Sequence, residues 1–256
     1  MFRSITIIGG KGAMGRFFQQ RFQSLGLDVT GLDKPLEKKG LEKRVPVSDL
    51  VLLAVPAEAV EQVLGQMQDL LPASTVLADI CSVKVNPLRA MLRKHSGPVV
   101  GTHPLFGPCP EEGAGLRVAL VEGRDRQAWA KVRSLFESIG LAPFAAEAEE
   151  HDHALAFIQG LNFVSTVSYL AAVTHEPATR KYLTPSFERR LQAARKMLTE
   201  DSELFQSLFE ANPYSQDAVR CYRSYLNLAA AGELDLLENK AAWWWSKETS
   251  GGGASG

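Results

Sequence analysis

A histidine and a serine occupy positions that suit reacting groups. His103 ends the apolar run "PVVGTH" (98–103), and the proline- and glycine-rich segment after it would hold its backbone stiffly. Because histidine ordinarily titrates at about pH 6.5, a neutral imidazole can accept a hydroxyl proton as hydride leaves the same carbon. A hydrogen-bonded structural histidine is the alternative. Ser82, in "LADICSVKVNPL" (77–88), would orient the hydroxyl or the imidazole, or else cap the next helix.

A glycine-rich loop near the N-terminus predicts a dinucleotide site. It follows an apolar run (4–9), precedes a helical pattern and matches GxGxxG, which is the setting that this motif requires. Its glycines would let the backbone approach a pyrophosphate at the helix N-terminus. The candidate cofactor-binding residues of the loop are Gly10, Lys11, Gly12, Ala13, Met14 and Gly15.

An acidic residue sets the expected cofactor preference. Asp33 closes the predicted strand 28–33, where a carboxylate can accept hydrogen bonds from ribose hydroxyls. Because it would repel a 2′-phosphate, it favours NAD over NADP, and the neighbouring Lys34 weakens that preference. Val55 and Pro56, at the end of the predicted strand 50–56, complete the cofactor-binding set.

The elements around these residues alternate between strands and helices. Apolar runs alternate with patterns of helical spacing, and a further strand, helix and strand continue to about residue 148. This alternation predicts an α/β fold with a Rossmann-type, doubly wound parallel sheet. The five strands expected first cover 4–9, 28–33, 50–56, 75–80 and 98–103.

The second half of the chain is helical in pattern. Long helical patterns, broken by turn signals at "HEPAT" and "NPYS", predict a second, all-helical domain. The predicted domains are therefore 1–149, which binds NAD, and 150–246. The Gly/Ser-rich tail 247–256 is expected to be disordered.

Composition narrows the class of protein. The 256 residues are 45% hydrophobic and carry a net charge of −1. A nearly neutral chain has no overall electrostatic attraction to nucleic acid or to acidic membranes. No uninterrupted apolar stretch is long enough to span a bilayer. The three cysteines form no CxxC pair, and the N-terminus lacks a signal-peptide pattern, so we expect a cytoplasmic protein that binds a small molecule.

Two other clusters favour structural roles. His151 and His153 do not share a helix face and lack a third ligand, so we predict no metal site, and Asp152 is better explained by helix capping and hydrogen bonding between domains. The tryptophans at 243–245 are typical of packing at a domain or dimer interface.

Four motifs in order give the chain a resemblance to a known family. They are "GGKGAMG", "SVK" at 82–84, "THPLFGP" around His103 and "EHDHALAFIQGL" at 150–161. Together they resemble prephenate dehydrogenase, especially the dehydrogenase part of the bifunctional chorismate mutase and prephenate dehydrogenase. Since no mutase-type helical segment precedes the glycine loop, we expect a single-function enzyme.

The resemblance implies a reaction and residue roles. In the family, NAD takes hydride from the ring carbon that carries the hydroxyl, a histidine at the position of His103 accepts the proton, and CO₂ is lost to give 4-hydroxyphenylpyruvate, the precursor of tyrosine. The family's serine corresponds to Ser82. The helical domain is expected to supply the other substrate contacts and a homodimer interface.

Two positions depart from the family pattern. Ungapped alignment puts Lys196, with Arg195 adjacent, where the family has an arginine that binds the substrate carboxylate. Either residue could bind it, and lysine lacks the bidentate fork of arginine. Phe163 stands where many members have a pocket histidine.

These departures leave alternatives open. The same chemistry could act on arogenate or a 4-amino-4-deoxyprephenate-like substrate, or the chain could be a regulatory protein that binds NAD without catalysis. The hydroxyacid dehydrogenases and imine reductases also join a Rossmann domain to a helical one. The hydroxyacid members use a lysine that "HDHALAFIQGLN" lacks.

Overall fold

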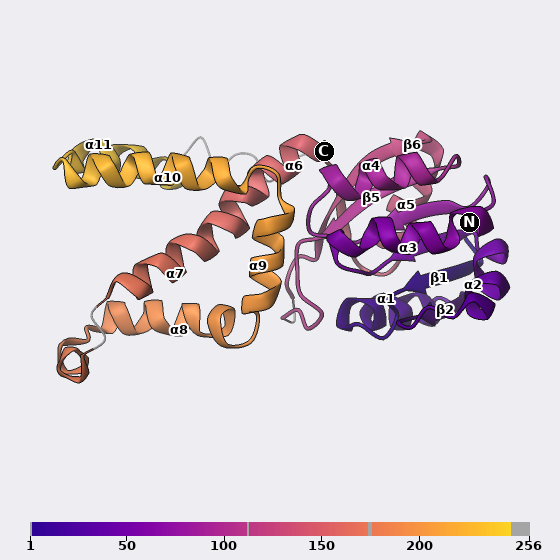
Figure 1. Cartoon of the computed structure of the whole chain (residues 1–256), viewed down its shortest axis with the longest axis horizontal. Coiled ribbons are helices and arrows are strands. Elements are labelled where there is room, and N and C mark those ends of the chain that lie inside the picture. Colours follow the sequence, from indigo (N-terminus) through magenta and orange to yellow (C-terminus); the bar gives the residue numbers. More distant parts are fainter. Residues whose placement is uncertain (1, 112, 174–175, 247–256) are drawn as a thin grey trace. The chain divides into compact units, whose positions relative to one another are not determined.

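A computed structural model describes residues 2–111, 113–173 and 176–246, and divides the chain into two compact units (Figure 1). Unit 1 comprises 1–155 with 206–213, and unit 2 comprises 156–205 with 214–256. The sequence-predicted boundary at 149/150 lies inside helix α6 (Ala148–Leu155). The tail 247–256, expected to be disordered, lies outside the described residues.

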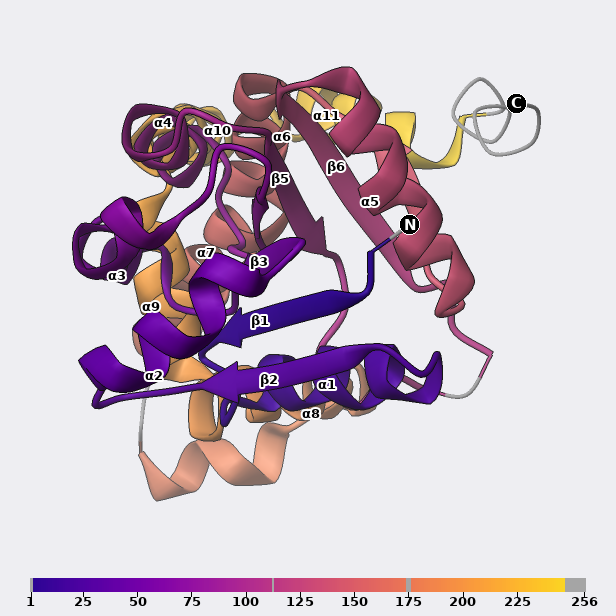
Figure 2. The same ribbon diagram turned by 90° about the vertical axis from the view of Figure 1, so that its right-hand side faces the viewer.

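Unit 1 is built on a seven-stranded sheet in the order β2-β1-β3-β4-β5-β6-β7. The first five strands are parallel, as the alternating pattern predicted, and Figure 2 shows β1 and β2 side by side. The strands are β1 (Ser4–Ile8), β2 (Asp28–Leu32), β3 (Leu50–Leu53), β4 (Val76–Asp79), β5 (Val99–Pro104), β6 (Arg117–Arg124) and β7 (Ala142–Ala145).

The sheet departs from the predicted parallel arrangement at its last two strands, which run opposite to the first five. Strand β6 runs antiparallel to β5, and β7 is parallel to β6. No helix occurs among the described residues between Pro104 and Arg117, so the chain returns beside β5 without the crossover helix that a parallel neighbour needs.

Helices cover both faces of the sheet. On one face, α1 (Ala13–Ser24) and α5 (Arg126–Ser138) pack through aromatic rings, and the centroids of Phe18 and Phe136 lie 5.4 Å apart. The other face carries α3 (Val60–Met67) and α4 (Val85–Lys94) (Figure 2). Strand residues therefore meet a helix on both sides, which explains the continuous burial of strands such as β3. The remaining short elements of this unit are α2 (Lys38–Arg44) and 3₁₀ turns at Val45–Val47, Ala57–Ala59 and Gln68–Leu70.

Unit 2 is helical, as predicted. Its helix α7 (Asn162–Ala172) continues from α6 through a π-helical stretch, Ala156–Leu161, and packs against α8 (Pro185–Thr199). The rings of Phe163 and Phe205 stack with centroids 5.6 Å apart. The other elements of unit 2 are α10 (Ser215–Ala230), α11 (Leu234–Ala241) and 3₁₀ turns at Pro177–Tyr182 and Ala242–Trp245. Helix α9 (Ser202–Ala211) begins in unit 2, and its residues from Gln206 onward belong to unit 1.

One helical run is long and apolar. The run Ala148–Ala172 contains an 18-residue window of mean hydropathy 1.4, so by length and composition it could cross a membrane. The core helix of a soluble protein passes the same test. In this chain the first residues of the run include His151 and Asp152, which are buried polar residues of the site described next.

Candidate active site

The glycine loop joins β1 to α1 at the carboxyl edge of the sheet. A Cβ on Gly15 would lie 2.2 Å from the carbonyl oxygen of Gly9, so this glycine is required for α1 to pack against the loop. A Cβ on Gly12, in contrast, would meet only that same oxygen, at 3.2 Å. Gly12 is exposed at the start of α1, whose first-turn N–H groups lack acceptors within the helix. The loop therefore suits the close approach of an anionic ligand.

Asp33 is fixed beside this loop by two backbone groups. Its Oδ2 accepts a hydrogen bond from the Lys11 N–H at 2.8 Å, and its Oδ1 accepts one from the Lys34 N–H at 2.8 Å. A hollow at the ends of β1, β2 and β3 is lined by Gly12, Asp33, Val55 and Pro56, among others. Four of the sequence-predicted cofactor residues therefore line one hollow, and the rest of the predicted loop, Gly10 to Gly15, joins β1 to α1 beside it. The hollow lies where β1 is flanked by β2 and β3 and the strand order reverses. These residues fit a dinucleotide.

A buried ion pair connects the ends of β4 and β5. Lys84 Nζ donates to Asp79 Oδ2 at 2.5 Å and to the Thr102 carbonyl oxygen at 2.6 Å, and the side chains of Lys84 and Asp79 are completely buried. Asp79 also accepts hydrogen bonds from the backbone N–H groups of Cys81 and Thr102. The pair therefore holds the segment that carries Ser82 against the strand that ends near His103.

Asp152 caps helix α4 from a distant part of the sequence. Its Oδ1 accepts from the Lys84 N–H at 2.6 Å and its Oδ2 from the Val85 N–H at 2.8 Å. The capping role predicted for Asp152 is therefore confirmed. The hydrogen bonding between domains that was predicted with it is not, because Asp152, Lys84 and Val85 all belong to unit 1. The alternative role predicted for Ser82 was to cap α4. Among the described residues the half-buried Ser82 makes no such capping hydrogen bond. Asn212 supports the arrangement, since its Nδ2 donates to the Asp152 carbonyl oxygen at 2.7 Å.

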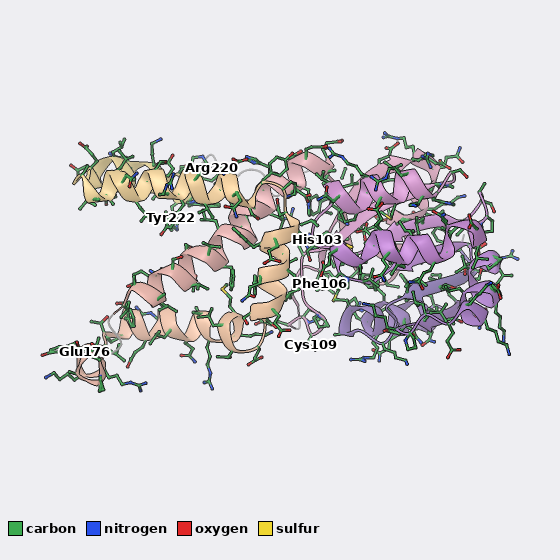
Figure 3. The ribbon with its side chains drawn as sticks, viewed as in Figure 1. His103, Phe106, Cys109, Glu176, Arg220 and Tyr222 are labelled. Carbon is green, nitrogen blue, oxygen red and sulfur yellow. The ribbon has the colours of Figure 1, made fainter. Side chains whose placement is uncertain are left out.

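His103 lies at the end of β5, one strand from the end of β4 (Figure 3). The side chain is buried, and its Nδ1 lies 2.9 Å from Nε2 of His151. His151 Nδ1 in turn lies 2.8 Å from Asp152 Oδ1. Burial lowers the pKa of His103 well below the ordinary 6.5, and the nearby ammonium of Lys84 lowers it further. The ring is therefore neutral near pH 7 and able to accept a proton.

The other sequence candidates, Arg195, Lys196 and Phe163, belong to unit 2. Arg195 and Lys196 are exposed on α8, where Lys196 Nζ lies 3.9 Å from Asp201 Oδ2. Phe163 is buried against Phe205, so it packs within the unit and offers no hydrogen bond.

Sequence reasoning missed three members of the group. In the sequence, Lys84 stands out only as part of the motif "SVK", no pattern marks Asp79, and His151 suggests only a metal ligand. A lysine and an aspartate five residues apart at a strand end were the only local signal for the ion pair. Nothing local connects His151 to His103, which lies 48 residues earlier.

Comparison with known proteins identifies this arrangement. The family model for the nucleotide-binding domain of prephenate dehydrogenase matches residues 32–140. The T-protein of Enterobacter agglomerans is 31% identical over 224 residues, which cover 86% of this chain and 60% of that protein. These matches support a member of the prephenate dehydrogenase family.

Solved structures of family members share the fold. Prephenate dehydrogenase from A. aeolicus, in complex with hydroxyphenyl propionate and NAD⁺, superimposes with a TM-score of 0.75 at 18% identity, covering 98% of this chain and 96% of that one. Arogenate dehydrogenase from Synechocystis gives a TM-score of 0.75 at 17% identity, covering 94% and 96%. The chain spans 52–60% of the length of three curated relatives that it matches.

The cysteines are separate from the proton-accepting group of this protein. Burial, with Asp79 nearby, raises the pKa of the Cys81 thiol well above 9.0, so Cys81 stays a neutral thiol. Cys109 is exposed on the segment that leaves β5, beyond His103 and Phe106 (Figure 3). Within the described ranges, no group of three histidine, cysteine, aspartate or glutamate side chains could hold a metal ion.

Proposed function

We propose that the protein is an NAD-dependent prephenate dehydrogenase of tyrosine biosynthesis, which converts prephenate to 4-hydroxyphenylpyruvate by oxidative decarboxylation. One observation carries this proposal. A buried histidine with a lowered pKa stands at the same sheet edge as a nucleotide-binding hollow, in a chain that matches the prephenate dehydrogenase family. Hydride removal from a carbinol carbon needs both a hydride acceptor and a base for the hydroxyl proton.

The cofactor proposed for the hollow is NAD. Bound NAD⁺ would supply the hydride acceptor. Gly12 leaves the start of α1 open to a pyrophosphate, and the oriented carboxylate of Asp33 would accept hydrogen bonds from ribose hydroxyls and repel a 2′-phosphate. The A. aeolicus relative with NAD⁺ supports this choice.

His103 and Ser82 are the proposed reacting and orienting groups. His103 accepts the substrate's hydroxyl proton, and Ser82 donates or accepts a hydrogen bond at the same hydroxyl. The C–H bond electrons leave as hydride while the O–H bond electrons form the carbonyl, and loss of the ring carboxylate as CO₂ aromatises the ring. The gain from aromatisation means that the protein needs only to orient the hydroxyl and take its proton.

A basic residue of α8 is proposed to bind a substrate carboxylate. Lys196, the residue that aligns with the family arginine, is the first candidate, and Arg195 is the second. Both are exposed and cationic. A lysine would bind as a point charge, so we expect weaker orientation than a bidentate arginine gives.

The substrate could also be arogenate or a 4-amino-4-deoxyprephenate-like compound. The Synechocystis relative is an arogenate dehydrogenase, and Phe163 removes a polar group that many family members carry. A regulatory protein that binds NAD without turnover is the alternative from another class. The neutral, hydrogen-bonded His103 argues against it.

We also propose that the protein is a cytoplasmic homodimer joined through unit 2. Large apolar side chains are exposed along its helices, and Trp243, Trp244 and Trp245 are 58%, 67% and 82% exposed. Exposed aromatic residues of this kind favour protein interfaces. Light scattering after size-exclusion chromatography tests this state, and a monomer at micromolar concentration would contradict it.

The decisive experiment follows reduced cofactor by absorbance. Purified protein is mixed separately with NAD or NADP and with prephenate or arogenate. Fast NADH formation with prephenate, together with 4-hydroxyphenylpyruvate in the product, supports the proposal. Turnover with arogenate alone changes the substrate, and NAD binding without turnover of either compound favours the regulatory alternative.

A further inference from the structure

We propose that His151, held by Asp152, is a positioning residue that fixes the protonation state of His103 so that Nε2 of His103 is the proton acceptor. The inference rests on the proposed function, because it assigns the base of that reaction to one nitrogen. It stands on a chain of two short contacts: His103 Nδ1 to His151 Nε2 at 2.9 Å, and His151 Nδ1 to Asp152 Oδ1 at 2.8 Å.

The direction of the two hydrogen bonds is set by Asp152, the last of the three hydrogen-bonded side chains. Asp152 accepts from the backbone N–H groups of Lys84 and Val85, which are obligatory donors, so its carboxylate acts as an acceptor. His151 must therefore donate from Nδ1–H to Asp152 Oδ1. In a neutral ring the other nitrogen, Nε2, then has a lone pair and no proton.

The second contact carries this constraint to His103. Two ring nitrogens 2.9 Å apart need one proton between them, and His151 Nε2 has none to give. His103 therefore donates from Nδ1–H, and its neutral ring keeps the lone pair on Nε2. Without His151, His103 could place its proton on Nε2 and would then be unable to accept one there.

We take the ring of His151 as neutral, and the ¹H–¹⁵N spectra described below test that assignment. His103, His151 and Asp152 are all buried, and the ammonium of Lys84 lies in the same buried group. Asp152 also shares its carboxylate with the N-terminus of α4, so its charge is already hydrogen-bonded by two backbone groups.

The arrangement separates orientation from basicity. A carboxylate in direct contact with His103 would raise the pKa of the imidazole, whereas a neutral imidazole accepts the Nδ1–H bond without adding a full negative charge. The substrate O–H bond breaks with its electron pair left on oxygen, and the proton binds the Nε2 lone pair of His103. The resulting imidazolium still donates from Nδ1 to His151, so the positive charge is stabilised through a bond that already exists.

The protonation state can be measured without any turnover. Long-range ¹H–¹⁵N correlation spectra of the ¹⁵N-labelled full chain distinguish Nδ1–H from Nε2–H imidazoles, and the five histidines make the spectrum simple to assign with a His103→Asn variant. We expect His103 as the Nδ1–H form at pH 7.5 in the wild-type protein. An Nε2–H form of His103, or a doubly protonated His151, would overturn the inference even if the protein is active.

Kinetic variants test the consequence for catalysis. His151→Leu removes the acceptor, so we expect kcat to fall about tenfold to a hundredfold with NAD affinity unchanged, and the acid limb of the kcat/KM profile to move. His151→Gln places a carbonyl oxygen near the former Nε2 and should restore most of the loss. The exposed neighbour gives the matched control, His153→Leu, which should leave kcat and the pH profile as they are.

The outcomes separate the two proposals. If His151→Leu keeps the wild-type pH profile, or if Gln is as damaging as Leu, the positioning role is wrong while the dehydrogenase activity stands. If the wild-type protein turns over neither prephenate nor arogenate, the proposed function fails, and the spectra still report whether His151 sets the state of His103.

Discussion

Lys84 Nζ and Asp79 Oδ2 lie 2.5 Å apart with both side chains completely buried, and the pair joins the segment of Ser82 to the strand of His103. Burying two charges costs free energy, which their contact and the hydrogen bonds around them must offset. The pair also keeps the ammonium near the imidazole, where its charge helps to lower the pKa of His103. One contact therefore affects both the shape of the site and the basicity of its histidine.

Removing one partner of this pair should strongly destabilise unit 1. Lys84→Met leaves the Asp79 carboxylate buried without its cation, and we expect a loss of about 3–5 kcal/mol in the free energy of unfolding. The double variant Asp79→Asn with Lys84→Met should recover part of it. Urea unfolding followed by circular dichroism measures both.

The exposed pair Arg93 and Glu61 provides the control for that measurement. Their side chains are 57% and 63% exposed, so Arg93→Ala should cost less than about 1 kcal/mol. If Lys84→Met lowered the free energy of unfolding as little as Arg93→Ala does, the buried pair would add no more stability than a surface contact.

Replacing the proposed base should reduce turnover and spare the cofactor site. His103→Asn keeps a polar side chain but removes the imidazole, and we expect kcat to fall about a hundredfold or more. NAD affinity, measured by fluorescence titration, should change little, because the hollow is lined by residues of other strands. Turnover near the wild-type rate would exclude His103 as the base.

Acid should destabilise the fold through its buried histidines. Burial lowers the pKa of His103 and of His95, so the folded state binds fewer protons than the unfolded state below about pH 6.5. The free energy of unfolding should therefore fall as pH drops below that value, by up to about 1.4 kcal/mol per pH unit for each histidine until its folded pKa is reached. His103→Asn should flatten this dependence between pH 6.5 and 5, and an unchanged slope would contradict the assignment.

The cofactor preference should depend on Asp33. Asp33→Asn replaces one of the two oxygens that accept the Lys11 and Lys34 N–H groups and removes the charge that repels a 2′-phosphate. We expect Kd for NAD to rise about tenfold and the preference for NAD over NADP to shrink, by titration of both cofactors. Lys34→Ala is the matched control, since it keeps the backbone donor, and it should retain NAD binding.

The features that sequence predicted are those set by neighbours along the chain. The glycine loop, the acid that ends β2 and the histidine that ends β5 follow from local patterns and from the rule that ligands bind at the carboxyl edge of parallel strands. The antiparallel direction of β6 was not predictable in this way, because no pattern between Pro104 and Arg117 specifies the direction of return.

The hydrogen bonds around His103 could not be predicted from local sequence patterns, for a different reason. Asp152 contacts Lys84 and Val85 across 68 and 67 residues, and these contacts exist only because α6 packs beside the start of α4. Capping by Asp152 could be expected from its residue type, but its partner helix could not. Long-range packing selects one pairing among many that the sequence allows.

The residue that binds the substrate carboxylate should be revealed by KM. We expect Lys196→Ala to raise KM for prephenate about tenfold with little change in kcat, because a charge contact kept throughout the reaction contributes uniform binding. Lys196→Arg should lower KM, since guanidinium can form two parallel hydrogen bonds to a carboxylate.

Arg195→Ala is the matched control on the same helix and should leave KM within about twofold of wild type. A rise in KM for Arg195→Ala but not for Lys196→Ala would transfer the role to Arg195. No change in either variant would exclude this part of α8 from substrate binding.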